Sequence, residues 1–295
     1  MKLYAIRKKI NDFIFKIKFE YIFLQKSHNI IIHDSKETLE YILNRQCSVS
    51  RYGDGEYYVM AGKGNSFQEP NQVLSKRLRE ILISNQPNHI VCLPITMKTV
   101  DYCTKEAANF WRKFFINNGE DWLNMCDKNK EYYDTQISRF YMDYKNKTNR
   151  APFICLLKKV WEKKDIVIIE GEKTRMGIGN DLFNNSLSIS RILTPAENAY
   201  DKYDKILNTI IEKTPKTSLI LLAVGMTATV LAYDLANKGY QAIDIGHLDI
   251  EYEWFINKAI TKEKIQGKAV NEAGNIAEVQ ECKNDLYKSQ IIAII

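Results

Sequence analysis

The sequence predicts an α/β protein with a mainly parallel sheet flanked by helices. Through the second half of the 295-residue chain, short apolar runs typical of buried strands alternate with longer helical segments. Strands that are joined through helices form right-handed crossovers, and these place neighbouring strands parallel. A chain of this length can bury about three quarters of its unfolded surface, so a full core needs no disulfide or metal support.

The second half carries the clearest alternation. Strands are expected at residues 165–169, 191–193, 218–224 and 242–245, and helices at 181–190, 201–213, 227–238 and 249–259. Gly239 follows the third of these helices, in the position where a glycine commonly ends a helix. The last 30 residues have too weak a pattern to predict any element.

The first half combines the same elements with a helix-rich insertion. Asp34 and Glu37 have capping-box spacing for a helix that runs to about residue 44. Further expected elements are a strand through residue 49, a helix over 71–84 and a strand over 89–93. From about residue 99 to 150 the chain is aromatic and charged, which predicts a helical insertion. Residues 34–295 are expected to form one domain.

Residues 1–33 are treated separately because residues 3–24 predict a basic amphipathic helix. Its apolar positions recur at three- and four-residue steps: Ile6, Ile10, Phe13, Ile17, Tyr21 and Leu24. Residues 1–33 hold seven lysines and arginines against two acidic residues, and so carry most of the net charge of +6. Such a helix lies on an anionic membrane surface, or it packs on its own domain or a partner subunit, and both alternatives stay open.

Composition argues against several function classes. The remainder of the chain is close to neutral, which disfavours a general nucleic-acid binder. The six cysteines form no C-x-x-C pair, so they indicate buried free thiols rather than a zinc or redox site. Neither a signal peptide nor a run of about 18 apolar residues is found, so the protein is expected to be cytoplasmic.

The most informative motif is Arg51-Tyr52-Gly53-Asp54-Gly55-Glu56, which follows a strand-like run. Carboxylates at Asp54 and Glu56 on a glycine-containing turn can converge on one hard cation such as Mg²⁺ or Mn²⁺. A metal with few protein ligands keeps positions open for substrate phosphates, and Arg51 would face a phosphate or a carboxylate. The alternative is an exposed acidic turn with a local ion pair.

A basic, glycine-rich loop follows the strand at 165–169 and spans residues 171–181. Its glycines allow the backbone to approach a ligand closely, and Lys173 and Arg175 would neutralise phosphate. Asp181 is expected to cap the next helix, whose first amides also favour anions. The alternative is a flexible surface loop.

Two more polar clusters follow strands, where ligands bind in parallel sheets. Gly225 and Thr227 open a helix, and Thr227 is expected either to cap it or to meet a diphosphate. His247, Asp249 and Glu251 are candidates for a general base or for binding sugar hydroxyls, with capping by Asp249 as the structural alternative.

The combination of these motifs resembles the bacterial glycosyltransferases of the GT-D structural type. Their hallmark is a D-x-E motif in an Arg-aromatic-Gly-Asp-Gly-Glu context, which residues 51–56 match. The likeness covers roughly residues 34–272 and extends through Gly179-Asn180-Asp181-Leu182-Phe183, Pro195-Ala196-Glu197-Asn198-Ala199-Tyr200, Gly225-Met226-Thr227-Ala228-Thr229 and Gly246-His247-Leu248-Asp249-Ile250-Glu251-Tyr252-Glu253-Trp254.

The resemblance implies a Rossmann-like fold, a UDP-sugar donor and Mn²⁺ or Mg²⁺, with Asp54 and Glu56 at the UDP–metal site. The donor-binding residues expected are Arg51, Lys173, Arg175, Asn180, Asp181, Gly225 and Thr227. In one departure, Ile178-Gly179 stands where relatives often carry an arginine beside the asparagine.

The expected function is therefore a metal-dependent transfer of a sugar, glucose first of all, from UDP to a glycan acceptor in cell-surface polysaccharide or glycoprotein synthesis. The acceptor is lipid-linked or sits on an adhesin, and residues 1–24 would place the enzyme at the inner face of the plasma membrane. His247, Asp249 and Glu251 are the candidate catalytic residues. The alternatives are a non-catalytic, membrane-docked partner of a glycan-synthesis complex and a metal-dependent phosphohydrolase.

Overall fold

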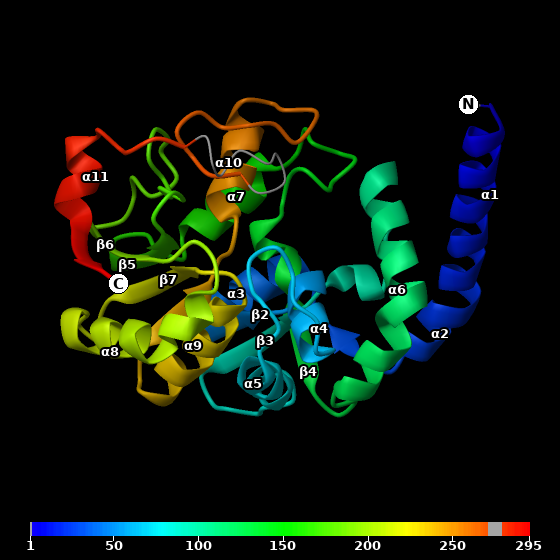
Figure 1. The fold of residues 1–295 in the computed structure, drawn as a ribbon, viewed down its shortest axis with the longest axis horizontal. Helices are drawn as coiled ribbons and strands as arrows, with labels where there is room; N and C mark the ends of the chain where they lie inside the picture. The colour runs from blue at the N-terminus through cyan, green and yellow to red at the C-terminus, as the bar shows by residue number, and fades with distance from the viewer. Residues whose placement is uncertain (1, 271–278) are drawn as a thin grey trace.

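A computed structural model describes residues 2–270 and 279–295 and confirms the α/β class. Nine strands form one sheet in the order β1-β4-β3-β2-β8-β7-β5-β6-β9, and the pairings between them are parallel. Helices lie on both sides of the sheet, and a helical hairpin lies beyond one end of it (Figure 1).

The elements have the following bounds. The strands are β1 (Ile31–Ile32), β2 (Ser48–Arg51), β3 (His89–Leu93), β4 (Glu131–Asp134), β5 (Asp165–Gly171), β6 (Ser188–Thr194), β7 (Leu219–Ala223), β8 (Gln241–Asp244) and β9 (Ile291–Ile294). The α-helices are α1 (Lys2–Lys18), α2 (Leu24–Ser27), α3 (Ser35–Arg45), α4 (Asp54–Met60), α5 (Gln72–Leu82), α6 (Lys105–Met125), α7 (Ala151–Lys158), α8 (Tyr203–Lys213), α9 (Met226–Asn237), α10 (Leu248–Ile256) and α11 (Asp285–Gln290). A π-helical segment, η1 (Phe19–Phe23), joins α1 to α2, and the short 3₁₀ helices are η2 (Ile95–Met97), η3 (Thr135–Ser138) and η4 (Ala199–Lys202).

Side chains of the central strands alternate between two cores, because successive residues of a strand point to opposite faces of the sheet. In β5, Ile166 and Ile168 belong to the core that α3, α7 and α10 cover. Val167 and Ile169 belong to the core that α8 and α9 cover. Burial on both faces explains why β5 and β7 are continuous apolar runs rather than alternating ones.

Most predicted elements are present, but two predictions for the chain between residues 99 and 190 were wrong. The insertion contains α6 as expected, yet it also contributes β4, which pairs with β3 and is part of the sheet. The helix predicted over 181–190 is absent, since residues 181–187 form turns and β6 begins at Ser188. Asp181 does not cap a helix, because its carboxylate accepts hydrogen bonds from Tyr252 and Lys158 instead.

The N-terminal segment is helical, as predicted, and packs on α6 through aromatic rings. Phe23 stacks on Phe115 with ring centroids 4.9 Å apart, and Phe19 stacks on Phe23 at 5.5 Å. Gly119 of α6 permits this approach, since a Cβ there would lie 2.2 Å from the ring of Phe23. Among the described residues, no helix is both long and apolar enough to cross a bilayer.

The order of the strands reverses at the centre of the sheet, and this reversal positions the site. β2 and β8 are neighbours there, with β3, β4 and β1 on one side and β7, β5, β6 and β9 on the other. In open α/β sheets such a reversal leaves a crevice outside the carboxyl ends of the strands, where ligands bind.

Candidate active site

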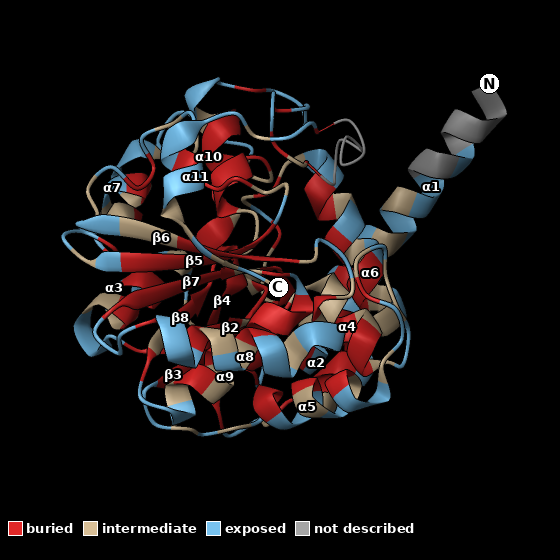
Figure 2. Ribbon diagram, turned by 60° about the vertical axis from the view of Figure 1, so that its left-hand side comes forward, coloured by how far each residue is buried: buried red, intermediate tan, exposed pale blue. Residues whose placement is uncertain are grey.

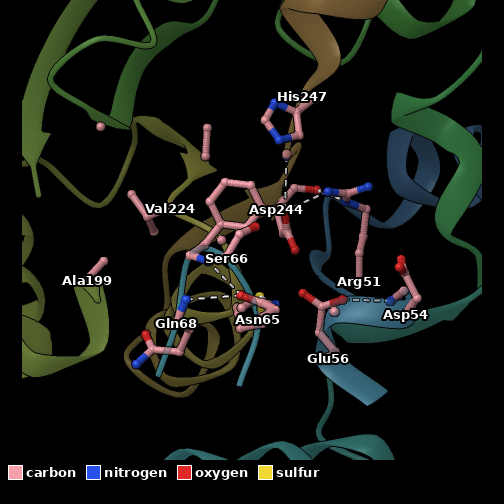
Figure 3. Close-up of a pocket in the computed structure, with 18 of the residues that line it drawn as sticks. Arg51, Asp54, Glu56, Asn65, Ser66, Gln68, Ala199, Val224, Asp244 and His247 are labelled. Atoms are coloured by element: carbon pink, nitrogen blue, oxygen red, sulfur yellow. Dashed lines mark hydrogen bonds and ion pairs between the residues drawn. The ribbon is translucent and has the colours of Figure 1, made fainter. Parts of the chain in front are cut away.

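A cleft of about 500 Å³ opens at that crevice, within the size range of small-molecule sites. It is lined by the ends of β2, β5, β7 and β8, the first turn of α4, one face of α6 and several loops. Figure 3 shows side chains from these separate parts of the chain converging on one space. Of the residues predicted from sequence, six line it: Arg51, Asp54, Glu56, Lys173, Gly225 and His247.

Arg51, the last residue of β2, holds the floor of the cleft together. Its Nε donates to the backbone oxygen of Asp244 at 2.8 Å, and its Nη2 donates to Asp244 Oδ1 at 3.0 Å. Its Nη1 donates to the Ser138 hydroxyl and to the backbone oxygen of Thr135. Arg51 therefore joins β2, β8 and η3, so much of its hydrogen-bonding capacity is spent on protein groups rather than on a ligand.

Gly246 makes room for this guanidinium. A Cβ at Gly246 would lie 2.1 Å from Arg51 Nη2, and the residue has a φ of +46°, which side chains rarely adopt. The Gly246 amide also donates to Asp244 Oδ1 at 3.1 Å. The turn after β8 thus requires glycine for two independent reasons.

Asp54 and Glu56 begin the helix α4 rather than occupying the extended turn that the sequence predicted. Residues at i and i+2 of a helix point to different sides, so the two carboxylates do not face each other directly. Glu56 folds back on the helix start, where its Oε2 accepts the Gly53 amide at 2.7 Å. Asp54 also lines the cleft, and in Figure 3 it lies to the right of Glu56.

At the floor of the cleft, the carboxylates of Glu56 and Asp244 lie near the guanidinium of Arg51. Burial, helped by the negative charge of Asp244 and opposed by the hydrogen bond from Gly53, raises the pKa of Glu56 to about 7. Burial also raises the pKa of Asp244, and Arg51 opposes that rise. Two carboxylates that share one guanidinium favour a further cation.

Such a donor set fits a hard cation, although incompletely. Carboxylate oxygens at Glu56, Asp54 and Asp244 are the ligand type that Mg²⁺ and Mn²⁺ prefer. Within residues 2–270 and 279–295, however, no group of three His, Cys, Asp or Glu side chains is arranged to hold a metal. A cation here would take only part of its coordination from protein, and ligand oxygens would supply the rest.

The N-terminus of α9 lies beside these carboxylates. Gly225 has a φ of +56° and turns the chain from β7 into α9, so that Gly225 and Met226 line the cleft. First-turn amides of a helix attract anions, so this end of α9 suits a phosphate group. Thr227 itself is buried and does not line the cleft. Thr229 ties α9 to β2 by donating to the backbone oxygen of Arg51 at 3.0 Å.

The glycine-rich loop after β5 contributes only its first part to the cleft. Lys173 and Thr174 line the cavity. Arg175 points elsewhere, since its guanidinium donates to the backbone oxygens of Gly267 and Gln280. Asn180 lies outside the cleft as well and donates to Asp249 and Glu253 at 2.7 Å each. Asp181 neither lines the cleft nor joins the contacts of Asn180. Its carboxylate pairs with Lys158 at 3.0 Å on the surface.

The three candidate catalytic residues on and before α10 separate into three different settings. His247 lines the cleft above Asp244 (Figure 3). Asp249 is buried and accepts the Gly177 amide at 2.9 Å and the Lys268 ammonium at 2.7 Å. Glu251 is buried too, and it accepts the amides of Tyr141 and Met142 at 3.0 and 2.9 Å. Asp249 and Glu251 therefore hold loops in place around the cleft rather than facing it.

Several lining residues were missed because they come from distant parts of the chain. They are Tyr58, Asn65, Gln68, Trp111, Gln136, Arg139, Thr174 and Asp244. Asp244 had a signal, since an aspartate inside an apolar strand must have a buried partner. Asn65 organises its own loop, accepting the amides of Phe67 and Gln68 at 2.8 and 3.0 Å. Trp111 has the period of an ordinary core residue, and nothing in its neighbourhood marks it out.

The family profile described as the glycosyltransferase GT-D fold matches residues 49–273. The chain belongs to this family. The match runs from β2 past α10, so it includes every residue that lines the cleft. The GT-D resemblance seen in the motifs is thereby confirmed, together with the fold class that it implied.

Two streptococcal proteins are similar to the GT-D chain over most of its length. The probable glycosyl transferase Gly of Streptococcus gordonii is 39% identical over 258 residues, which are 87% of this chain and 38% of that protein. Glycosyltransferase GlyD of Streptococcus pneumoniae serotype 4 (strain ATCC BAA-334 / TIGR4) is 35% identical over 274 residues, 92% of this chain and 33% of that protein. The chain thus spans little more than a third of the length of these curated relatives.

Solved structures agree with the GT-D assignment. One, described as the highly conserved domain of unknown function 1792 with a distinct glycosyltransferase fold, superposes with a TM-score of 0.89 at 39% identity. That alignment covers 94% of this chain and 99% of the other. A second, described as a new glycosyltransferase from Streptococcus sanguinis, gives a TM-score of 0.86 at 38% identity over 90% of this chain and 99% of the other.

Proposed function

We propose that this GT-D chain is a metal-dependent glycosyltransferase that moves a sugar from a UDP-sugar to a glycan acceptor in the synthesis of a cell-surface polysaccharide or glycoprotein. Glucose is the first candidate for the sugar. The observation that carries the proposal is the combination of two carboxylates, Glu56 and Asp244, beside the guanidinium of Arg51 with the amide end of α9. A cation beside an anion-binding helix end is the arrangement that a metal-bound diphosphate needs.

In this proposal Asp54 and Glu56 hold Mn²⁺ or Mg²⁺, and Asp244 adds negative charge next to them. When bound, the metal supplies a positive charge that stabilises the UDP leaving group. The amides that follow Gly225 bind the diphosphate, and Lys173, which also lines the cleft, helps to neutralise it. Arg51 acts indirectly, because its contacts with Asp244 keep the floor of the cleft in place.

We assign His247 as the base that accepts the proton of the acceptor hydroxyl. It is the one of the three candidates that lines the cleft, and an imidazole exchanges protons near neutral pH. Aromatic side chains at Tyr58 and Trp111 also line the cleft and offer a surface on which a sugar ring can stack. Asn180, Asp181, Arg175 and Thr227 support the walls of the cleft rather than contact the donor.

The proposal is tested by incubating the chain with UDP-glucose and Mn²⁺, with and without EDTA, and following release of UDP together with product formation by mass spectrometry. Glu56→Gln should abolish metal-dependent turnover, whereas Glu212→Gln, which removes an exposed carboxylate on α8, should not. Turnover that survives both EDTA and Glu56→Gln would refute the metal role.

The same assay separates the alternatives. No affinity for UDP in the presence of Mn²⁺ would favour a non-catalytic partner of a glycan-synthesis complex. Free sugar or phosphate, released at the same rate with and without acceptor, would favour a hydrolase. A screen of common UDP-sugars would then define the donor.

A further inference from the structure

The described side chains of α1 and η1 form two apolar faces, and one of these faces packs against α6. Asp12, Phe15, Phe19 and Phe23 lie on the face toward α6, where Phe19 and Phe23 are almost fully buried and Asp12 accepts a hydrogen bond from Asn109 at 3.2 Å. Four residues of the predicted stripe lie on the opposite face, whereas Leu24 packs against the core and the Ile6 side chain lies outside what the structure describes. These four, Ile10, Phe13, Ile17 and Tyr21, are exposed by 41% to 68%, and Ile14 between them by 42%.

This stripe is held rigidly on the outside of the molecule. The aromatic stack between η1 and α6, the Lys26–Glu120 ion pair at 2.6 Å and the bonds from Lys98 to the backbone oxygens of Ser27 and Ile30 fix the base of the hairpin. In Figure 2 the described turns of α1 extend away from the body with little buried surface. An apolar face of this kind on a soluble protein marks a contact surface.

Cationic side chains border the stripe on both sides. At 3.6 residues per turn, Arg7 and Lys18 lie about 60° and about 80° around the helix axis from Ile10, and Lys16 lies about 120° away in the other direction. All three are exposed. Glu20 pairs with Lys16 at 3.9 Å and is the acidic residue nearest the stripe.

We propose that this face of α1 binds an anionic lipid surface, with the stripe inserted at the boundary between headgroups and acyl chains. Lysine and arginine at the margins of an apolar face can extend to lipid phosphates while their stems stay beside the hydrocarbon. A second copy of the chain is a poorer occupant. Pairing two such stripes would bring Arg7, Lys16 and Lys18 of one helix against the same cations of the other, and like charges at those flanks oppose association.

This inference rests on the proposed function only for the reason why the enzyme would be at a membrane. The lipid contact itself is argued from the side chains of the helix. The free end of α1 and the start of α6, which carries Trp111 of the cleft, lie on the same side of the molecule (Figure 1). Docking through α1 would hold the chain at a membrane surface, where an acceptor that is linked to a lipid is found.

The test is flotation of the 295-residue chain with phosphatidylcholine vesicles, with and without phosphatidylglycerol, at low and high salt. Binding should require phosphatidylglycerol and weaken with salt. Phe13→Ser with Ile17→Ser should lower the partition coefficient by more than about tenfold. Lys16→Gln with Lys18→Gln should lower it by about fivefold per residue at low salt. As a matched control, Leu187→Ser with Ile260→Ser, which removes two even more exposed apolar side chains elsewhere, should change nothing.

Several results would overturn the proposal: no binding to either vesicle, equal binding to both, or binding that the Phe13/Ile17 variant retains. A dimer of the parent chain in light scattering, lost in that variant, would assign the stripe to a second copy instead. UDP affinity, measured by calorimetry with Mn²⁺, should be unchanged in every variant. Vesicle binding and nucleotide binding therefore succeed or fail independently.

Discussion

Gly246→Ala is the sharpest test of how the cleft is built. The new methyl group would lie 2.1 Å from Arg51 Nη2, so the guanidinium must leave its place beside Asp244. Loss of the charge-assisted hydrogen bond between Arg51 and Asp244 costs about 1.5–3 kcal/mol. The left-handed φ of +46° costs roughly a further 1–2 kcal/mol for alanine. Together these predict that the free energy of unfolding falls by about 2.5–5 kcal/mol.

A matched variant separates the two contributions. Gly62 also has a positive φ, +77°, but an added Cβ there meets nothing within 4 Å. Gly62→Ala should therefore lose only about 1–2 kcal/mol. For a chain of this size each kcal/mol shifts Tm by about 2 °C, so thermal unfolding followed by circular dichroism should place Gly246→Ala about 3–6 °C below Gly62→Ala. If the two variants melt at the same temperature, Arg51 does not occupy the position that this reasoning requires.

Three further predictions address the chemistry. The folded-state pKa of Glu56, about 7, lies above its ordinary value of 4.5, so ionising this residue costs stability as pH rises through 7. Glu56→Gln should thus be more stable than the parent at pH 8, with the gap closing toward pH 5, and Mn²⁺ should raise the parent's Tm more at pH 8 than at pH 6; a pH-independent gap would contradict the assignment. His247→Asn should lower kcat by about 10²–10⁴-fold with UDP affinity unchanged in calorimetry, and a variant that keeps its kcat would exclude His247 as the base. Asp249→Asn should cost about 3 kcal/mol in urea unfolding, because Lys268 loses one of two buried partners, while kcat of the folded protein is preserved; a stable but inactive variant would return Asp249 to the chemistry.

The sequence predicted the parallel sheet well because its central strands are apolar on both faces and its crossover helices have clear ends. Elements with weaker patterns were missed or misplaced. β4 contains Tyr132 and Tyr133 among charged residues, so its composition resembles the helical insertion around it. The helix predicted over 181–190 fails because Asp181 and Asn180 use their side chains in contacts that only the folded chain provides.

The candidate site was predicted by location more successfully than by role. The rule that ligands bind at strand ends correctly brought residues from β2, β5, β7 and β8 to one cleft. It does not say which polar side chain at each end faces inward. Asp249 and Glu251 belong to the same motif as His247, yet on the first turn of α10 they point at two different loops. Trp111 and Arg139 lie beyond the reach of any local pattern, because tertiary packing alone brings them to the cleft.

The D-x-E motif illustrates what spacing leaves undetermined. In an extended segment, carboxylates at i and i+2 share a side and can chelate one ion. On the first turn of α4 they diverge, and Glu56 instead caps its own helix through Gly53. The second carboxylate near Glu56 is Asp244, which arrives from β8 almost two hundred residues later and raises the Glu56 pKa. The proposed cation site therefore depends on the packing of β2 against β8, and on that proposal a methyl group at Gly246 should weaken Mn²⁺ binding as well as the fold.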